Sequence, residues 1–170
     1  MDIPVIGGPP GRGTLLWQGQ PHLCTLGRSG VRTDKREGDG ASPGGCFPVR
    51  AVFYRADRLT LPRTRLPSAA IARDDGWCDA PDDPAYNRKV RLPYPTSAEN
   101  LWRDDAVYDL VVVLGHNDDP VVPGAGSAIF LHLMRGDGGP TEGCVGVDRT
   151  LALALVAALG PDDWICISAG

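Results

Sequence analysis

The run Tyr108–Leu114, YDLVVVL, constrains the fold more than any other part of the chain. It is short, rich in valine and free of polar alternation, which is typical of a strand buried on both faces. Ser127–Leu133 (SAIFLHL) predicts a second buried strand of the same kind. The two runs therefore predict a sheet at the centre of the fold.

Shorter apolar runs predict further strands around this centre, at residues 14–18, 21–27, 47–54 and 164–167, with a turn at Gly19-Gln20. The chain also contains 22 glycines and 16 prolines, which favours a loop-rich, mostly β fold over a helix bundle. Lys35–Gly45 is charged and glycine-rich, so we expect a surface loop there.

One helix is predicted, over residues 148–159. Asp148 is suited to the N-cap, and Gly160-Pro161 stops the helix. Apolar residues run nearly all round this segment, so we expect it to be largely buried.

A length of 170 residues predicts a single domain over residues 1–170. Residues 60–106 contain prolines at 62, 67, 81, 84, 93 and 95, and we expect an ordered flap over the sheet near the site. Four of its residues are candidates to line a cleft: Trp77, Asp79, Tyr86 and Asn87.

The charge distribution limits the partners. The formal net charge is −4 and no block of Lys or Arg occurs, which weighs against nucleic acid as a partner. No run approaches the ~20 apolar residues of a membrane span, and the N-terminus shows no secretory signal. We expect a monomer without a cofactor.

Five cysteines occur, and none forms a C-x-x-C pair, so a zinc ribbon is not expected. Cys24 and Cys166 lie in apolar, strand-like runs and are expected to be small buried side chains. Cys46 and Cys78 lie in polar loops, and a disulfide between them stays open.

The fifth, Cys144, lies in the glycine turn T-E-G-C, one loop after His132. A thiol and an imidazole so arranged predict a cysteine nucleophile and its base. The backbone N–H groups of Gly143 and Cys144 are candidates for an oxyanion hole, flanked by Thr141 and Glu142. The helix that follows is expected to favour a thiolate.

Two other interpretations remain open for these residues. In the first interpretation, His132 and Cys144 are unrelated residues that form no catalytic pair. In the second, which has less support, Cys144, His132 and His116 bind zinc together with an acidic residue. No ligand pair has a familiar zinc spacing, so no metal is expected.

Two separated motifs resemble the L,D-transpeptidase catalytic domain (YkuD-like) family. S-A-I-F-L-H followed by T-E-G-C-V-G-V is similar to its strand histidine and [ST]-H-G-C motif. The upstream segment resembles the family's G-K-x-G-x-x-T-P-x-G-x-F pattern at Lys35, Gly38, Gly40, Ser42, Pro43, Gly45, Phe47 and Pro48. GWCDAPDDPAYN looks like a feature of a small proteobacterial branch.

This resemblance implies a β-sandwich-like domain with a helix beside the catalytic turn. It implies attack by Cys144 on a peptidoglycan stem peptide, with His132 as base, a thioester, and transfer to an amine of a neighbouring stem. A periplasmic or cell-envelope location is expected from the family. Candidate substrate contacts are Thr141, Glu142, Arg135, His116, Tyr86 and Asn87.

The chain departs from the family pattern at two places. Glu142 replaces the usual His of H-G-C, and Val145-Gly146-Val147 replaces an apolar-Arg-apolar run. Arg135 or Arg88 is a candidate to replace that arginine. The cross-link type, 3,3 or 1,3, stays open, as do an L,D-carboxypeptidase or amidase and a catalytically degenerate wall-binding domain.

Overall fold

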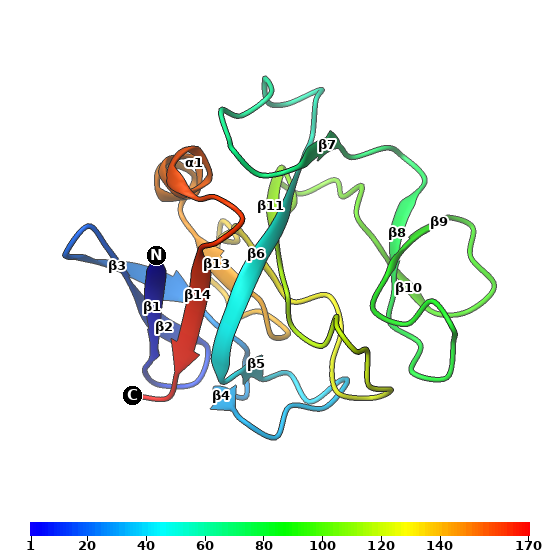
Figure 1. Cartoon of the computed structure of the whole chain (residues 1–170), viewed down its shortest axis with the longest axis horizontal. Coiled ribbons are helices and arrows are strands. Elements are labelled where there is room, and N and C mark those ends of the chain that lie inside the picture. Colours follow the sequence, from blue (N-terminus) through cyan, green and yellow to red (C-terminus); the bar gives the residue numbers. More distant parts are fainter.

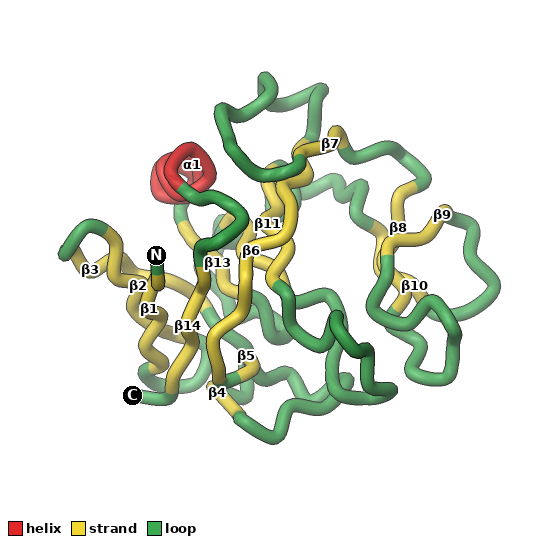
Figure 2. The backbone as a smooth tube through the Cα atoms, in the orientation of Figure 1, coloured by secondary structure: helices red, strands yellow, loops and turns green.

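The computed structural model describes residues 1–170, and its main feature is a nine-stranded sheet (Figure 1). The strand order is β11-β12-β13-β3-β2-β1-β14-β6-β7, and an added β11–β6 pairing closes the sheet on itself. The prediction of a mostly β fold with one helix is confirmed (Figure 2). The sheet consists of β1 (Asp2–Gly7), β2 (Arg12–Trp17), β3 (Gln20–Thr25), β6 (Gly45–Tyr54), β7 (Ser68–Ala70), β11 (Leu110–Leu114), β12 (Phe130–Leu133), β13 (Val145–Val147) and β14 (Trp164–Ser168).

Strand β11 is buried on both faces, as its composition predicts. Leu110, Val112 and Leu114 contribute to the large core of the closed sheet. Val111 and Val113 contribute to a smaller core on the other face. Because side chains alternate along a strand, one apolar run supplies both cores.

The first strand, β1, was not predicted from the sequence. Ile3 and Val5 are buried and alternate with exposed residues, but Pro4 interrupts the pattern. The proline is tolerated because β2 pairs with β1 only from Val5 onward. The turn after β2 is centred on Gln18-Gly19, one residue earlier than predicted, and both residues have positive φ angles.

The helix α1 (Arg149–Ala158) begins after the predicted N-cap, since the Asp148 side chain accepts hydrogen bonds from Thr150 N and Leu151 N. The expectation that the helix is largely buried is wrong. Only Leu151, Ala152, Leu155 and Val156 are buried, and the opposite face is open to solvent. Alanine and leucine are good helix formers, so an apolar residue on the open face is not evidence of burial. No helix has the length and apolar character that a membrane crossing requires.

Residues 60–106 contain a small second sheet, which lies to the right of the main sheet in Figure 1. Its strands are β8 (Asp75–Cys78), β9 (Lys89–Arg91) and β10 (Ala98–Asn100), in the order β10-β8-β9. Ile71, Trp77 and Leu101 from this segment share the smaller core with Phe130 and Cys144. The segment therefore packs on the face of the main sheet that contains the candidate nucleophile.

The structure answers the open question of the disulfide and corrects the expectation for Cys166. Cys46 pairs with Cys166 and not with Cys78, and Cys166 is half-buried in a disulfide, not a buried free thiol. The two residues face each other across the β14–β6 ladder. They are 120 residues apart in sequence, so local composition holds no information about their pairing.

The predicted surface loop Lys35–Gly45 is only partly exposed. Ala41 and Ser42 are buried, and β5 (Ser42–Pro43) pairs with β4 (Val31–Arg32). The Lys35 side chain is 5% exposed because it folds inward onto Asp39. This loop forms one wall of the site described next.

Candidate active site

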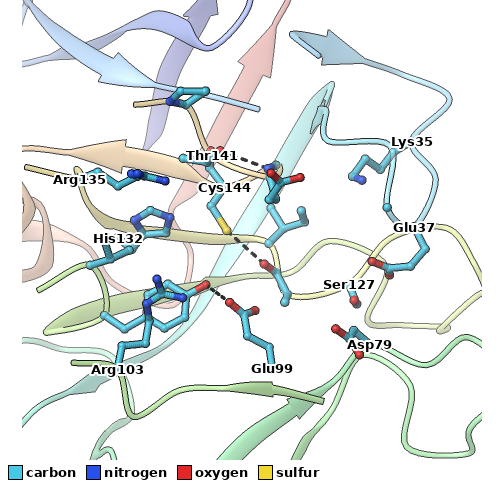
Figure 3. A pocket seen from close by; sticks show the side chains of 18 residues that line it. Lys35, Glu37, Asp79, Glu99, Arg103, Ser127, His132, Arg135, Thr141 and Cys144 are labelled. Carbon is cyan, nitrogen blue, oxygen red and sulfur yellow. Dashed lines mark hydrogen bonds between the residues drawn. The ribbon is translucent and has the colours of Figure 1, made fainter. Parts of the chain in front are cut away.

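Parallel pairing of β12 and β13 brings the two candidate catalytic residues together. His132 on β12 is opposite Gly146 on β13, and Cys144 immediately precedes β13. Both side chains line a cavity of about 450 Å³. Figure 3 shows the imidazole and the thiol on the same wall of this cavity.

The His132 ring is held in one orientation. Its Nδ1 lies 2.8 Å from the Leu133 carbonyl oxygen, and its ring packs edge-on against Tyr108 at 5.4 Å. A carbonyl only accepts, so Nδ1 carries the proton and Nε2 keeps a lone pair. Burial lowers the pKa of His132 to about 4. The residue is thus a neutral base at neutral pH.

The Cys144 thiol is protonated in the resting protein. Burial, together with the charge of Glu99, raises its pKa to about 12. Sγ donates to the Ala128 carbonyl at 3.2 Å and accepts from Phe130 N at 3.3 Å, and it forms no hydrogen bond to His132. Before the thiol can give its proton to the imidazole, the S–H group has to turn away from the Ala128 carbonyl.

The expected role of the helix is not supported. Strand β13 separates Cys144 from the first helical residue, Arg149, so the thiol is not in the first turn of the helix. The influence of a helix N-terminus falls off within about one turn. Burial therefore decides the protonation state of the thiol.

The candidate oxyanion donors differ in availability. Gly143 N donates to Thr141 Oγ1 at 3.1 Å, and Thr141 Oγ1 donates to the Cys144 carbonyl at 2.7 Å. The Cys144 N–H has no acceptor within the chain. Gly143 has a φ of +147°, and an added Cβ would lie 2.8 Å from the Ala41 carbonyl oxygen, so the turn requires glycine.

The glycine at the family's arginine position is also required by packing. A Cβ on Gly146 would lie 2.3 Å from the buried Thr25 Oγ1 and 3.7 Å from His132 Cε1. An arginine side chain therefore has no room at this place. Arg135 lines the cavity and pairs with Asp137, whereas Arg88 lies outside and donates to the Asp118 carbonyl.

The remaining predicted contacts divide into two groups. Thr141 and Glu142 line the cavity. His116, Tyr86 and Asn87 do not line it but support the segment that precedes β12: His116 Nε2 contacts the Ala125 carbonyl at 2.9 Å, and Tyr86 Oη accepts from Gly126 N at 3.0 Å. Asn87 Oδ1 accepts from Ala128 N and from Trp77 Nε1.

Several lining residues were not predicted from the sequence, among them five polar ones: Glu37, Glu99, Arg103, Tyr108 and Ser127. They come from four different segments. Ser127 and Glu37 lie within the two family-like motifs, at positions that carried no predicted role, and the other three belong to no recognisable motif. For Tyr108, the available signal was its position in the strongest predicted strand. Asp79, a candidate from the proline-rich segment, does line the cavity.

The comparisons with known proteins agree with this geometry. The family model described as YkuD, the L,D-transpeptidase catalytic domain, matches residues 11–167. No curated protein and no solved structure matches the chain. Since the family match covers nearly all of its 170 residues and includes both motifs, this chain belongs to the L,D-transpeptidase catalytic domain family.

Proposed function

We propose that the protein is a peptidoglycan L,D-transpeptidase that joins stem peptides through a thioester on Cys144. The main support is the pairing of β12 with β13, which brings a neutral His132 and the Cys144 thiol to one wall of a cavity. The family to which the chain belongs consists of cysteine-dependent enzymes of this class.

In the proposed reaction, His132 Nε2 takes the thiol proton while Sγ attacks the carbonyl carbon of a stem peptide bond. The Cys144 N–H stabilises the oxyanion. The C–N bond then breaks, and the imidazolium gives its proton to the leaving amine. In the second half, an amine of another stem attacks the thioester, His132 takes a proton from it, and the thiol is restored.

The change at Glu142 does not argue for a degenerate, catalytically inactive domain. The Glu142 side chain is 77% exposed and pairs with Arg28 at 3.1 Å. Because this carboxylate is held by Arg28 in solvent, it leaves the proton transfer between Cys144 and His132 unobstructed. The burial of Cys144 and His132 favours transfer to an amine over transfer to bulk water, which supports a transferase over a carboxypeptidase or amidase.

The Cys46–Cys166 disulfide supports action in the cell envelope, because disulfides persist in oxidising compartments. We infer that the protein acts there on muropeptides as a monomer.

The test is cross-linking of isolated muropeptides by the wild-type protein and by Cys144→Ala. We expect the variant to form no dimers, and Cys24→Ala, which removes a buried core thiol outside the cavity, to keep the activity. Persistent dimers with Cys144→Ala would exclude the proposal. Trimmed monomers without dimers would instead identify a hydrolase. The mass of the adduct on Cys144 names the bond attacked and separates 3,3 from 1,3 chemistry.

A further inference from the structure

The charges that line the cavity are unevenly balanced. Each lining cation has a carboxylate partner that lies outside the lining: Lys35 pairs with Asp39, Arg103 with Asp105, and Arg135 with Asp137. The acid Glu142 is likewise paired with Arg28, outside the lining.

Three other acids of the lining, Glu37, Asp79 and Glu99, form no ion pair. Glu37 and Glu99 accept only neutral phenol donors, from Tyr86 at 2.5 Å and from Tyr108 at 2.6 Å. Asp79 Oδ1 is buried without any hydrogen-bond partner. Carboxylates without an ion-pair partner in a partly buried site have a cost in free energy, which indicates that a ligand supplies the missing partner.

A second observation points to the same ligand. Ser127 is 8% exposed, and its buried Oγ has no hydrogen-bond partner although it lies on the cavity wall. Figure 3 shows Ser127 beside Asp79 and Glu37 on one side of Cys144, where Lys35 also lies, and His132, Arg103 and Arg135 on the other side. Glu99 lies between Arg103 and Asp79. The cavity lining therefore combines three carboxylates that form no ion pair with an unsatisfied hydroxyl.

Glu99 responds to the charges around it, and the thiol responds to Glu99. Burial raises the pKa of Glu99; the hydrogen bond from Tyr108 and the charge of Arg103 oppose this rise, and the charges of Asp79 and Glu37 add to it. The charge of Glu99 in turn raises the pKa of the Cys144 thiol. A cation bound among these acids would reverse both effects and ease the loss of the thiol proton.

An organic cation fits the site better than a metal ion. No group of three or more His, Cys, Asp or Glu side chains is close enough to hold a metal. A primary ammonium has three N–H donors, which can reach several separated acceptors, and it is a common group on diamino-acid residues of peptides.

We propose that Glu37, Asp79, Glu99 and Ser127 form a binding subsite for the primary ammonium group of an amine-bearing stem residue. This inference rests on the proposed function, since it names the chemistry of the substrate for the same site. The amine belongs either to the acyl donor or to the acceptor, and the two sources differ in the step that they affect.

The first arm of the test measures binding to Cys144→Ala, which cannot react. A stem peptide with a free side-chain amine is compared with the same peptide after acetylation of that amine. We expect the free amine to bind about 10- to 100-fold more tightly, in the range of one charged hydrogen-bonded contact. Adding Asp79→Asn or Glu37→Gln should remove most of this preference.

The matched control is Glu142→Gln in the same Cys144→Ala background. It removes one negative charge from the same cavity, but that charge is already paired with Arg28. We expect the preference for the free amine to remain. Equal binding of the two peptides, or equal losses in Glu142→Gln and Asp79→Asn, would overturn the subsite. Thermal unfolding shows that the variants are folded.

The second arm follows the Cys144 adduct of the wild-type protein by mass spectrometry, without an acceptor. If the adduct forms more slowly with the acetylated donor peptide than with the free amine, the subsite binds the donor amine. Equal adduct rates combined with a binding preference assign it to the acceptor amine. If no stem peptide forms an adduct with Cys144, the proposed function is excluded. The binding measurements of the first arm would still decide whether the subsite exists.

Discussion

Burial controls the chemistry of His132 and Cys144 at the residue scale. The pKa of the imidazole is lowered to about 4 and that of the thiol is raised to about 12, in each case mainly by burial. Both groups are therefore neutral over the whole physiological range. The resting site holds a thiol and a free base, and substrate binding has to start the proton transfer.

This state predicts an unusual dependence of activity on acid. An unperturbed histidine titrates near pH 6.5, whereas His132 stays neutral down to about pH 4. We expect kcat/KM to be nearly constant from about pH 5 to 8 and to fall below about pH 5 as the base is protonated. A loss of activity centred near 6.5 would show that another group limits the rate. The measurement is kcat/KM of adduct formation against pH.

The same shift predicts a loss of stability in acid. The unfolded chain binds a proton at His132 near pH 6.5, but the folded protein binds it only near pH 4. The free energy of unfolding should therefore decrease by up to about 3 kcal/mol as the pH falls from 6.5 to 4. His132→Phe should lose this contribution, so its stability should change less between pH 7 and 4.5. Parallel stability curves for the two proteins would contradict the assignment.

At the scale of elements, the segment before β12 shapes the environment of the thiol. Ala128 has a φ of +52°, an unfavourable value for a residue with a side chain, and its carbonyl accepts a hydrogen bond from the Cys144 thiol. Asn87 Oδ1 holds this conformation by accepting from Ala128 N, and it also accepts from Trp77 Nε1. The proline-rich segment thus positions the nucleophile through one amide side chain.

We therefore expect Asn87→Ala to weaken both stability and acylation. It leaves two donors, on Trp77 and Ala128, without their acceptor, at about 1–3 kcal/mol each where buried. Urea unfolding and the rate of Cys144 adduct formation measure the two effects.

Asn117→Ala is the matched control for this variant. Asn117 also has a positive φ, and its amide holds Val122 and Gly126 of the same segment without contacting Ala128. We expect a smaller loss of stability and a nearly unchanged adduct rate. Equal slowing by both variants would mean that Asn87 acts only through general loosening of the segment.

At the scale of the whole molecule, the two ends of the chain are neighbouring strands of the main sheet. β1 pairs in parallel with β14, and β14 pairs with β6, where the disulfide lies. Cys46 is exposed, so reductants can reach the bond. The bond closes a loop of 120 residues in the unfolded chain.

Reduction of the disulfide should lower the free energy of unfolding by about 2–5 kcal/mol, because a long loop gains conformational entropy in the unfolded state. Urea unfolding with and without reductant measures the change. The double variant Cys46→Ala with Cys166→Ala should have the stability of the reduced wild-type protein in both conditions, and it should not respond to reductant. A response in that variant would place the redox effect at another cysteine.

Much of the framework follows from local sequence. The apolar run of β11, the capped helix and the order of His132 and Cys144 each depend on residues within a few positions of one another. Hydrophobic periodicity, N-cap chemistry and turn composition act over that range. The strand histidine, the glycine turn and the family resemblance were accordingly predictable.

Only the tertiary structure decided what depends on distant partners. The pairing of Cys46 with Cys166, the place of β1 beside β14 and the set of three unpaired acids all join segments far apart in the chain. The protonation states of Cys144 and His132 belong to this group as well, because burial is a property of everything packed around a side chain. The sequence alone determined which groups are available for the chemistry, and the packing decided their charge.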